Sequence, residues 1–178
     1  MAKKEILKQF IRSWEGDYVN HPNDKGCETK WGVTIGTFRA VYGKNKTVLD
    51  LKNMTESQWD YIFGQVFWNK CKADLINNQS VANIIVDWYW GSGTTALKRI
   101  QRILGVTPDG IFGSKTIGAI NGTDASTLFA TLWRARKAHF EEIARNPSQK
   151  VFLKGWLNRL SGIKFGRLVC NGGRIVTF

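Results

Sequence analysis

Two carboxyl groups and one hydroxyl group near the N-terminus have the types and spacing for acid–base chemistry. Glu15 is followed nine residues later by Asp24 and fourteen residues later by Thr29. One carboxyl group can deliver a proton to a leaving oxygen, while a second carboxylate manages water or a developing positive charge. A hydroxyl group such as that of Thr29 can orient the attacking water. Asp17 and Glu28 lie in the same polar segment and are alternatives for the second carboxylate.

Glu15 is the strongest candidate for the acid because of the segment that precedes it. Apolar residues recur at helical spacing and predict a helix that stops at Gly16; they are Ile6, Leu7, Phe10, Ile11 and Trp14. An apolar surface and a helix C-terminus both favour the neutral form of a carboxyl group, which is the form that donates a proton. The alternative is that Glu15 is a solvated residue at a helix end.

Asp87 is a second unusual carboxylate, because it falls within an almost uniformly apolar stretch, residues 80–90. Such a stretch predicts a central helix that is buried on all sides. A carboxylate there must be paired or hydrogen-bonded. Asp87 could face the cleft and support Glu15, or it could pair with an arginine for structural reasons. We favour the structural role.

The remaining pattern predicts a mainly helical (α+β) fold, a helical bundle with a small β-hairpin or loop near residues 17–33. Capping signals at Thr55, Ser114, Asp124 and Asn146 mark four of the helix starts. Residues 165–178 carry no clear signal. The further helices are expected at 34–41, 55–71, 80–90, 97–104, 114–120, 124–143 and 147–160.

The charge is strongly positive and unevenly distributed. The chain has 26 Lys and Arg against 14 Asp and Glu, a net charge of +12. Residues 1–90 carry a net charge of +2 and residues 91–178 a net charge of +10. The partner is therefore expected to be a polyanion: nucleic acid, an anionic membrane or an acidic cell-wall polymer.

Several classes of protein are excluded by what the sequence lacks. Three cysteines, Cys27, Cys71 and Cys170, are too few for a disulfide scaffold, and no His/Cys cluster suggests a metal site. No apolar run is long enough to span a membrane, and no apolar segment at the N-terminus indicates a secretory signal. We expect no metal and no organic cofactor.

A family resemblance lies in residues 14–19 (WEGDYV) and 21–34 (HPNDKGCETKWGVT). They resemble the signature of glycoside hydrolase family 108, N-acetylmuramidases of phages and bacteria, with the pattern E-G-G-Y followed by D-P-x-D-x-G-G-x-T-x-x-G-I-T. Asp17, His21 and Cys27 depart from that pattern. The resemblance implies a lysozyme-like fold, with Glu15 as proton donor and Asp24 and Thr29 as water-positioning or cation-stabilising residues.

A second resemblance covers residues 104–120, LGVTPDGIFGSKTIGAI. This segment is similar to the D-G-x-F-G-x-x-T segment of peptidoglycan-binding modules. It implies substrate contacts at Asp109, Gly110 and Gly113, although a glycine-rich structural turn is an equal alternative. Tyr18 and Trp31, within the first resemblance, are the expected substrate-binding aromatic residues.

Together the resemblances imply a lysozyme-type glycoside hydrolase that binds peptidoglycan strands. We expect it to be a monomer that neither inserts into membranes nor binds a specific nucleic acid. A catalytic half, 1–90, and a peptidoglycan-binding half, 91–178, are expected to pack as one globular unit. The bond cleaved would be the β-1,4 bond between N-acetylmuramic acid and N-acetylglucosamine, with inversion or retention left open.

The alternatives are a non-catalytic wall-binding protein and a basic nucleic-acid-binding protein. We expect synthesis in the cytoplasm and action on the wall, in the periplasm, after release through a holin or another route. A phage endolysin, a prophage remnant and a secretion-linked wall remodeller fit equally well.

Overall fold

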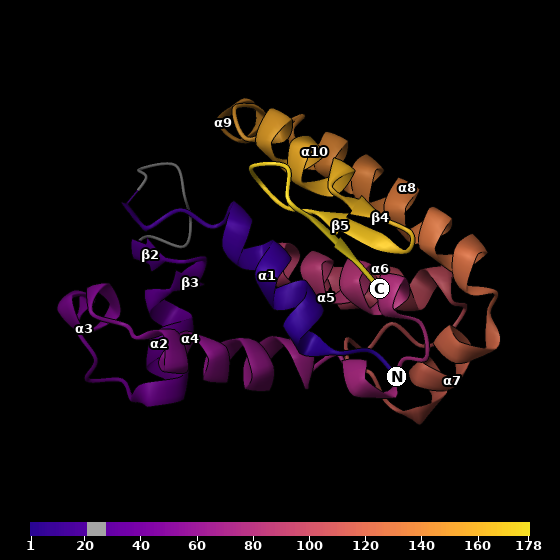
Figure 1. Cartoon of the computed structure of the whole chain (residues 1–178), viewed down its shortest axis with the longest axis horizontal. Helices are drawn as coiled ribbons and strands as arrows, with labels where there is room; N and C mark the ends of the chain where they lie inside the picture. The colour runs from indigo at the N-terminus through magenta and orange to yellow at the C-terminus, as the bar shows by residue number, and fades with distance from the viewer. Residues whose placement is uncertain (21–27) are drawn as a thin grey trace.

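The computed structural model describes residues 1–20 and 28–178, and these form a mostly helical protein with two small antiparallel sheets (Figure 1). This confirms the predicted lysozyme-like α+β fold class. The helices are α1 (Lys4–Trp14), α2 (Ile35–Tyr42), α3 (Val48–Lys52), α4 (Glu56–Ile62), α5 (Gln79–Ser92), α6 (Thr94–Ile103), α7 (Ser114–Gly122), α8 (Ala125–Ile143), α9 (Pro147–Lys150) and α10 (Leu153–Ser161), with a π-helical turn at Phe63–Trp68 and a 3₁₀ turn at Ala73–Leu75.

Helix α5 is the centre of the core, as its uniformly apolar sequence predicts. Every residue from Ser80 to Tyr89 is buried, and α1, α6 and α8 pack around it (Figure 1). The Asn78 side chain caps its start by accepting hydrogen bonds from the backbone amides of Ser80 and Val81. Gly93 ends the helix at φ +56°, a left-handed conformation that glycine adopts without strain.

The predicted β segment near residues 17–33 is present as a three-stranded sheet: β1 (Tyr18–Asn20), β2 (Glu28–Lys30) and β3 (Val33–Thr34). Thr29 pairs with Val19 on one side and with Thr34 on the other. The Thr34 side chain then caps α2 by accepting from the amide of Thr37. The sheet therefore connects α1 directly to the second helix.

The C-terminal tail forms a second sheet that the sequence pattern did not reveal. Strands β4 (Ile163–Lys164), β5 (Arg167–Val169) and β6 (Ile175–Thr177) pair in sequence order. Ile163 and Leu168 are buried in the main core, and β5 contacts α1. Strands of two or three residues are too short to show a periodicity of two, which is why this region gave no signal.

Three of the predicted caps are present, and three of the expected helices differ in detail. The helix expected at 55–71 ends as α4 at Ile62 and continues as the π-helical turn Phe63–Trp68. Thr55 and Asp124 cap α4 and α8 as expected. Ser114 does not cap α7; Gly113 occupies the cap position, without a side-chain hydrogen bond. The helix expected at 147–160 is two helices, α9 and α10, which are separated at Val151–Phe152. None of the helices in the described ranges is long and apolar enough to cross a membrane.

The turn between α6 and α7 is held by the buried side chain of Gln101. Its Oε1 accepts from the amide of Gly110 at 2.7 Å, and its Nε2 donates to Asp109 Oδ1 at 2.7 Å and to the carbonyl of Ile111 at 3.0 Å. The amide of Ile111 and the Gln101 side chain hold the pKa of Asp109 below its ordinary value. These contacts are internal and support the structural alternative for this segment. Substrate contact by the segment stays a prediction.

We predict that Gly110→Ala destabilises the protein by about 1–3 kcal/mol, because an L-residue is strained there. Gly110 has φ +80°, and an added Cβ would lie 2.6 Å from Thr94 Cγ2. Urea denaturation followed by circular dichroism measures the change. The matched control is Gly118→Ala within α7, where an added Cβ meets nothing within 4 Å. Equal stability of the two variants would contradict the argument.

Candidate active site

Glu15 lies at the C-terminal end of α1, where its backbone amide still donates to the carbonyl of Ile11. Its carboxyl oxygen Oε1 accepts two hydrogen bonds: from Trp90 Nε1 of α5 at 2.8 Å and from Arg159 Nη1 of α10 at 2.6 Å. The side chain is 16% exposed. Sequence reasoning anticipated the helix end but expected mainly apolar neighbours; the partners of this carboxylate are an indole N–H and a guanidinium group.

The Glu15 side chain opens onto a cleft of about 310 Å³ that both halves of the sequence line. Residues from the end of α1, from the first sheet and from the end of α5 form one side, and residues from α8 and α10 form the other. Its lining residues are Glu15, Thr29, Gly32, Thr34, Trp90, Gly91, Ser92, Arg136, Phe140, Ile143, Trp156 and Arg159.

Gly32 lets the first sheet approach the carboxyl group closely. An added Cβ at this position would lie 2.6 Å from both Cδ and Oε2 of Glu15 and 2.6 Å from Trp90 Cζ2. Its φ of +76° also excludes most L-residues. Two independent reasons therefore require glycine at this position: the backbone conformation and the space that Glu15 and Trp90 occupy.

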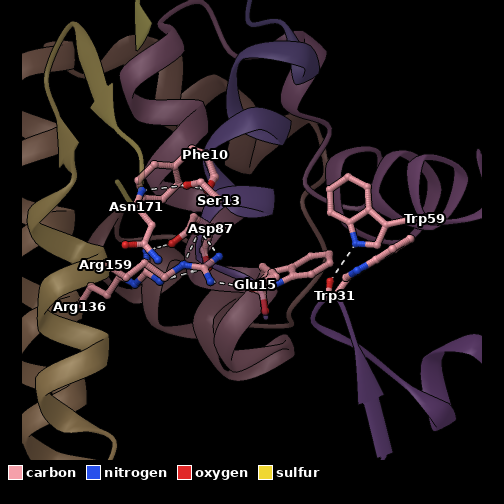
Figure 2. A network of polar contacts seen from close by, with 10 residues as sticks. Phe10, Ser13, Glu15, Trp31, Trp59, Asp87, Arg136, Arg159 and Asn171 are labelled. Atoms are coloured by element: carbon pink, nitrogen blue, oxygen red, sulfur yellow. Dashed lines mark hydrogen bonds and ion pairs between the residues drawn. The ribbon is translucent and has the colours of Figure 1, made fainter. Parts of the chain in front are cut away.

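Behind Glu15 lies a row of alternating charges, Glu15–Arg159–Asp87–Arg136, which Figure 2 shows with Arg159 between the two carboxylates. Arg159 donates to Asp87 Oδ1 through Nη2 at 2.7 Å and through Nε at 3.1 Å. Arg136 Nη1 lies 2.6 Å from Asp87 Oδ2, and its Nη2 donates to the Asp87 carbonyl at 3.1 Å. The side chain of Asp87 is 0% exposed and that of Arg136 2% exposed.

The ionisation of these groups follows from their contacts. Burial disfavours the charged form of Asp87, but the positive charges of Arg159 and Arg136 outweigh it and hold the pKa of Asp87 below its ordinary value. Burial likewise opposes the charge on Arg159, yet Asp87 and Glu15 together raise its pKa. Asp87 therefore pairs with arginines, as the favoured structural role requires, and it does not line the cleft. Its contact with the site is indirect, because Arg159 binds both Asp87 and Glu15.

The structure describes some of the residues that were predicted to act with Glu15. Thr29 lies on β2 and lines the cleft with Thr34, its neighbour on β3. Asp24 and Cys27 lie outside the described residues. The rival carboxylate Asp17 is exposed, and its carbonyl accepts a hydrogen bond from the Trp31 amide at 3.5 Å. The assignment of the second carboxylate therefore stays a prediction.

The aromatic residues at the cleft are not those expected from the sequence. Trp90 and Trp156 line it, whereas Tyr18 and Trp31 do not. The Trp31 ring lies under Arg12, whose Cζ is 4.1 Å from the ring centroid, and the Trp31 carbonyl accepts from Trp59 Nε1 (Figure 2). Substrate contact by Tyr18 or Trp31 stays a prediction, as does contact by Asp109, Gly110 or Gly113, which also do not line this cleft.

Sequence reasoning missed Arg159, Arg136, Trp90 and Trp156. Trp90 could have been found, since it lies one residue before the glycine-rich end of α5 and three after Asp87. No local signal marks either arginine among the fourteen bases of residues 91–178. In the described part of the chain, no group of three or more His, Cys, Asp or Glu side chains could hold a metal ion.

Comparison with known proteins agrees with this geometry. Residues 8–93 match the family described as glycosyl hydrolase 108, and residues 95–161 match a family described as a predicted peptidoglycan domain. The structure of Brucella abortus SagA is similar, with 30% sequence identity, a TM-score of 0.80 and coverage of 90% of this chain and 92% of that chain. No curated protein matches in sequence.

The chain belongs to the glycosyl hydrolase 108 family. It is a peptidoglycan hydrolase, with a peptidoglycan-binding region that follows the glycosyl hydrolase region. The division expected at residues 90 and 91 stays a prediction. The cleft nevertheless takes Arg136, Phe140, Ile143, Trp156 and Arg159 from the C-terminal half of this hydrolase, so the site is built across that boundary.

We predict that Asp87→Asn lowers the free energy of unfolding near pH 7 by about 3–5 kcal/mol, because the buried guanidinium of Arg136 and the mostly buried one of Arg159 lose their shared carboxylate. The depressed pKa of Asp87 means that its stabilisation is present above its ordinary pKa of 3.8 and is lost as pH falls through the lower folded value. Urea denaturation of both proteins from pH 7 to pH 2 should show the difference shrinking only below about pH 4.

The control for this series is Glu141→Gln, which breaks an exposed ion pair with Lys137 on the same α8 that carries Arg136. Its stability should match that of the unmodified protein throughout. A constant difference between Asp87→Asn and the unmodified protein down to pH 2 would mean that Asp87 is not a buried carboxylate held ionised by the arginines.

Proposed function

We propose that the protein is an N-acetylmuramidase that hydrolyses the β-1,4 bond between N-acetylmuramic acid and N-acetylglucosamine, with Glu15 as the general acid. The observation that carries the proposal is the position of the Glu15 carboxyl group, at the wall of a cleft and held from behind by Arg159 and Trp90. Membership of the glycosyl hydrolase 108 family and the following peptidoglycan-binding region support the same substrate.

The two oxygens of Glu15 have different surroundings, which gives them different roles in the proposed reaction. Both hydrogen bonds from Arg159 and Trp90 go to Oε1, and no hydrogen bond to Oε2 comes from the described part of the chain. In a carboxylic acid one oxygen accepts and the other carries the proton. Arg159 and Trp90 therefore fix the orientation of the group through Oε1 and leave Oε2 to carry the proton.

In the proposed reaction Oε2 transfers its proton to the glycosidic oxygen as the bond from that oxygen to the anomeric carbon breaks. Water attacks the anomeric carbon and gives up a proton, so that a hydroxyl group forms on each product. Thr29 would orient this water, and Asp24 would accept its proton or stabilise the positive charge. Direct attack by water requires carboxyl groups about 6.5–9.5 Å apart, and a covalent intermediate about 5 Å.

We predict that Glu15→Gln folds normally and loses at least roughly 10²–10⁴-fold in activity, the contribution of general acid catalysis. Glutamine retains the size and an oxygen that Arg159 and Trp90 can bind, but it cannot deliver the proton. The assay measures release of muramic acid reducing ends from purified sacculi. Glu5→Gln, an exposed position on the same helix, is the matched control and should retain full activity.

Activity of a folded Glu15→Gln protein within tenfold of the unmodified enzyme would overturn both the mechanism and the choice of site. Reducing ends on N-acetylglucosamine instead of muramic acid would retain the site and overturn the bond assignment.

We predict that Asp24→Asn also folds normally and loses much of the activity, because Asp24 is the proposed second carboxylate. Asp17→Asn is the comparison variant, since it changes the rival carboxylate by the same single atom. The same reducing-end assay and a thermal melt are run on both variants. A damaging Asp17→Asn and a silent Asp24→Asn would transfer the role to Asp17.

A further inference from the structure

A second cavity, of about 410 Å³, adjoins the catalytic cleft and is not used by the proposed mechanism. It is lined by Arg99 of α6, by three residues of α8 and by two residues at the start of α9, namely His139, Glu142, Ile143, Asn146 and Gln149. Ile143 lines this cavity and the catalytic cleft alike, so the two hollows share one wall residue. We call it the α8–α9 pocket; the two helices meet at the upper edge of Figure 1.

His139 lines this pocket, and its Nε2–H group is a hydrogen-bond donor. It is 5% exposed, and its Nδ1 accepts a hydrogen bond from Trp88 Nε1 at 3.1 Å. Burial lowers the pKa of His139, as do the charges of Arg99 and Arg136, against the opposing effect of Glu142. The neutral ring with Nδ1 as acceptor carries its proton on Nε2. No hydrogen-bond partner for Nε2 exists among the residues that the structure describes.

The other polar side chains of the pocket add donors from Arg99, Asn146 and Gln149, together with the carboxylate of Glu142, whose charge Arg99 balances. Arg99 Nη2 pairs with Glu142 Oε2 at 2.8 Å, which leaves further N–H groups of a half-exposed guanidinium available. Asn146 uses its Oδ1 for the amide and hydroxyl of Ser148, so its NH₂ group remains. Gln149 contributes a further amide. A ligand rich in carbonyl and carboxylate oxygens matches this set.

The lining residues of the α8–α9 pocket suit a peptide better than a sugar. Trp90 and Trp156 line the catalytic cleft, where a sugar ring can stack on an aromatic face. The α8–α9 pocket has no Trp, Tyr or Phe among its lining residues. Its amide and guanidinium groups instead match the backbone and carboxylates of an acidic peptide.

We propose that the α8–α9 pocket binds the acidic peptide stem that peptidoglycan carries on the lactyl group of N-acetylmuramic acid. This inference rests on the proposed function, because a glycan strand in the cleft would present that stem beside Ile143. Arg99 binds a stem carboxylate, His139 Nε2–H and the Asn146 amide donate to stem carbonyl groups, and Gln149 contacts the stem backbone. The pocket thus makes the enzyme selective for peptide-bearing strands.

The test is a binding measurement that does not depend on catalysis. The ligands are the disaccharide N-acetylglucosaminyl-N-acetylmuramic acid with its peptide stem and the same disaccharide without the stem. In both, N-acetylmuramic acid is the reducing end, so neither contains the bond from muramic acid to the next N-acetylglucosamine that is proposed to be cleaved. Isothermal titration should show tighter binding of the peptide-bearing form. Arg99→Gln should weaken that form about tenfold, equivalent to about 1.4 kcal/mol, and leave the bare disaccharide within twofold. Gln149→Leu should act in the same direction.

The matched control is Arg102→Gln, which removes the same charge from an exposed position on the same helix without lining the pocket. Equal affinity of the unmodified protein for both disaccharides would overturn the inference. So would an equal effect of Arg99→Gln and Arg102→Gln, which would indicate general charge attraction, or an equal effect of Arg99→Gln on both ligands.

Hydrolysis by the unmodified enzyme separates this inference from the function on which it rests. Peptide-bearing strands that yield no muramic acid reducing ends, while the titration still shows peptide-dependent binding through Arg99, would refute the proposed bond and retain the pocket. Cleavage of both kinds of strand with the same KM in the unmodified enzyme and in Arg99→Gln would refute the pocket and retain the muramidase.

Discussion

The contact between Arg159 and Asp87 is the interaction on which the rest of the site depends. Arg159 on α10 reaches into the core, donates twice to the buried Asp87 of α5, and with its remaining terminal nitrogen binds Glu15 at the end of α1. A buried guanidinium is costly unless its charge and its N–H groups are matched. Three helices far apart in the sequence must therefore meet in one arrangement before Glu15 is held at the cleft.

The contacts of Arg159 and Arg136 cross the boundary between the two parts of the chain that match different families. The two family matches meet between residues 93 and 95, and the acids that could perform chemistry precede that boundary. Yet Glu15 is held from behind by Arg159, and the pair Asp87–Arg136 also crosses the boundary. The C-terminal half thus supplies part of the acid's immediate surroundings in addition to its basic surface. An isolated N-terminal half would leave Asp87 without either of its counter-charges.

How much the sequence could predict depended on whether a feature was local. The α1 stripe, the capping box at Thr55 and the uniformly apolar α5 were read correctly, because helical periodicity and caps depend only on near neighbours. The second sheet was not predicted, since its strands have two or three residues and its stability comes from Ile163 and Leu168 packing in a distant core. Arg159 lies 144 positions after Glu15, and no spacing rule connects them.

The net charge of the C-terminal half overstates how much of its positive charge acts on the surroundings of the protein. The C-terminal half has a net charge of +10, but two of its arginines, Arg136 and Arg159, face carboxylates of the N-terminal half inside the protein. These two charges contribute to the placement of Glu15 and little to the field outside, because Asp87 and Glu15 compensate them. The attraction expected for an anionic wall would therefore come from the remaining exposed bases, whereas Arg136 and Arg159 connect Glu15 and Asp87 to the helices of the C-terminal half.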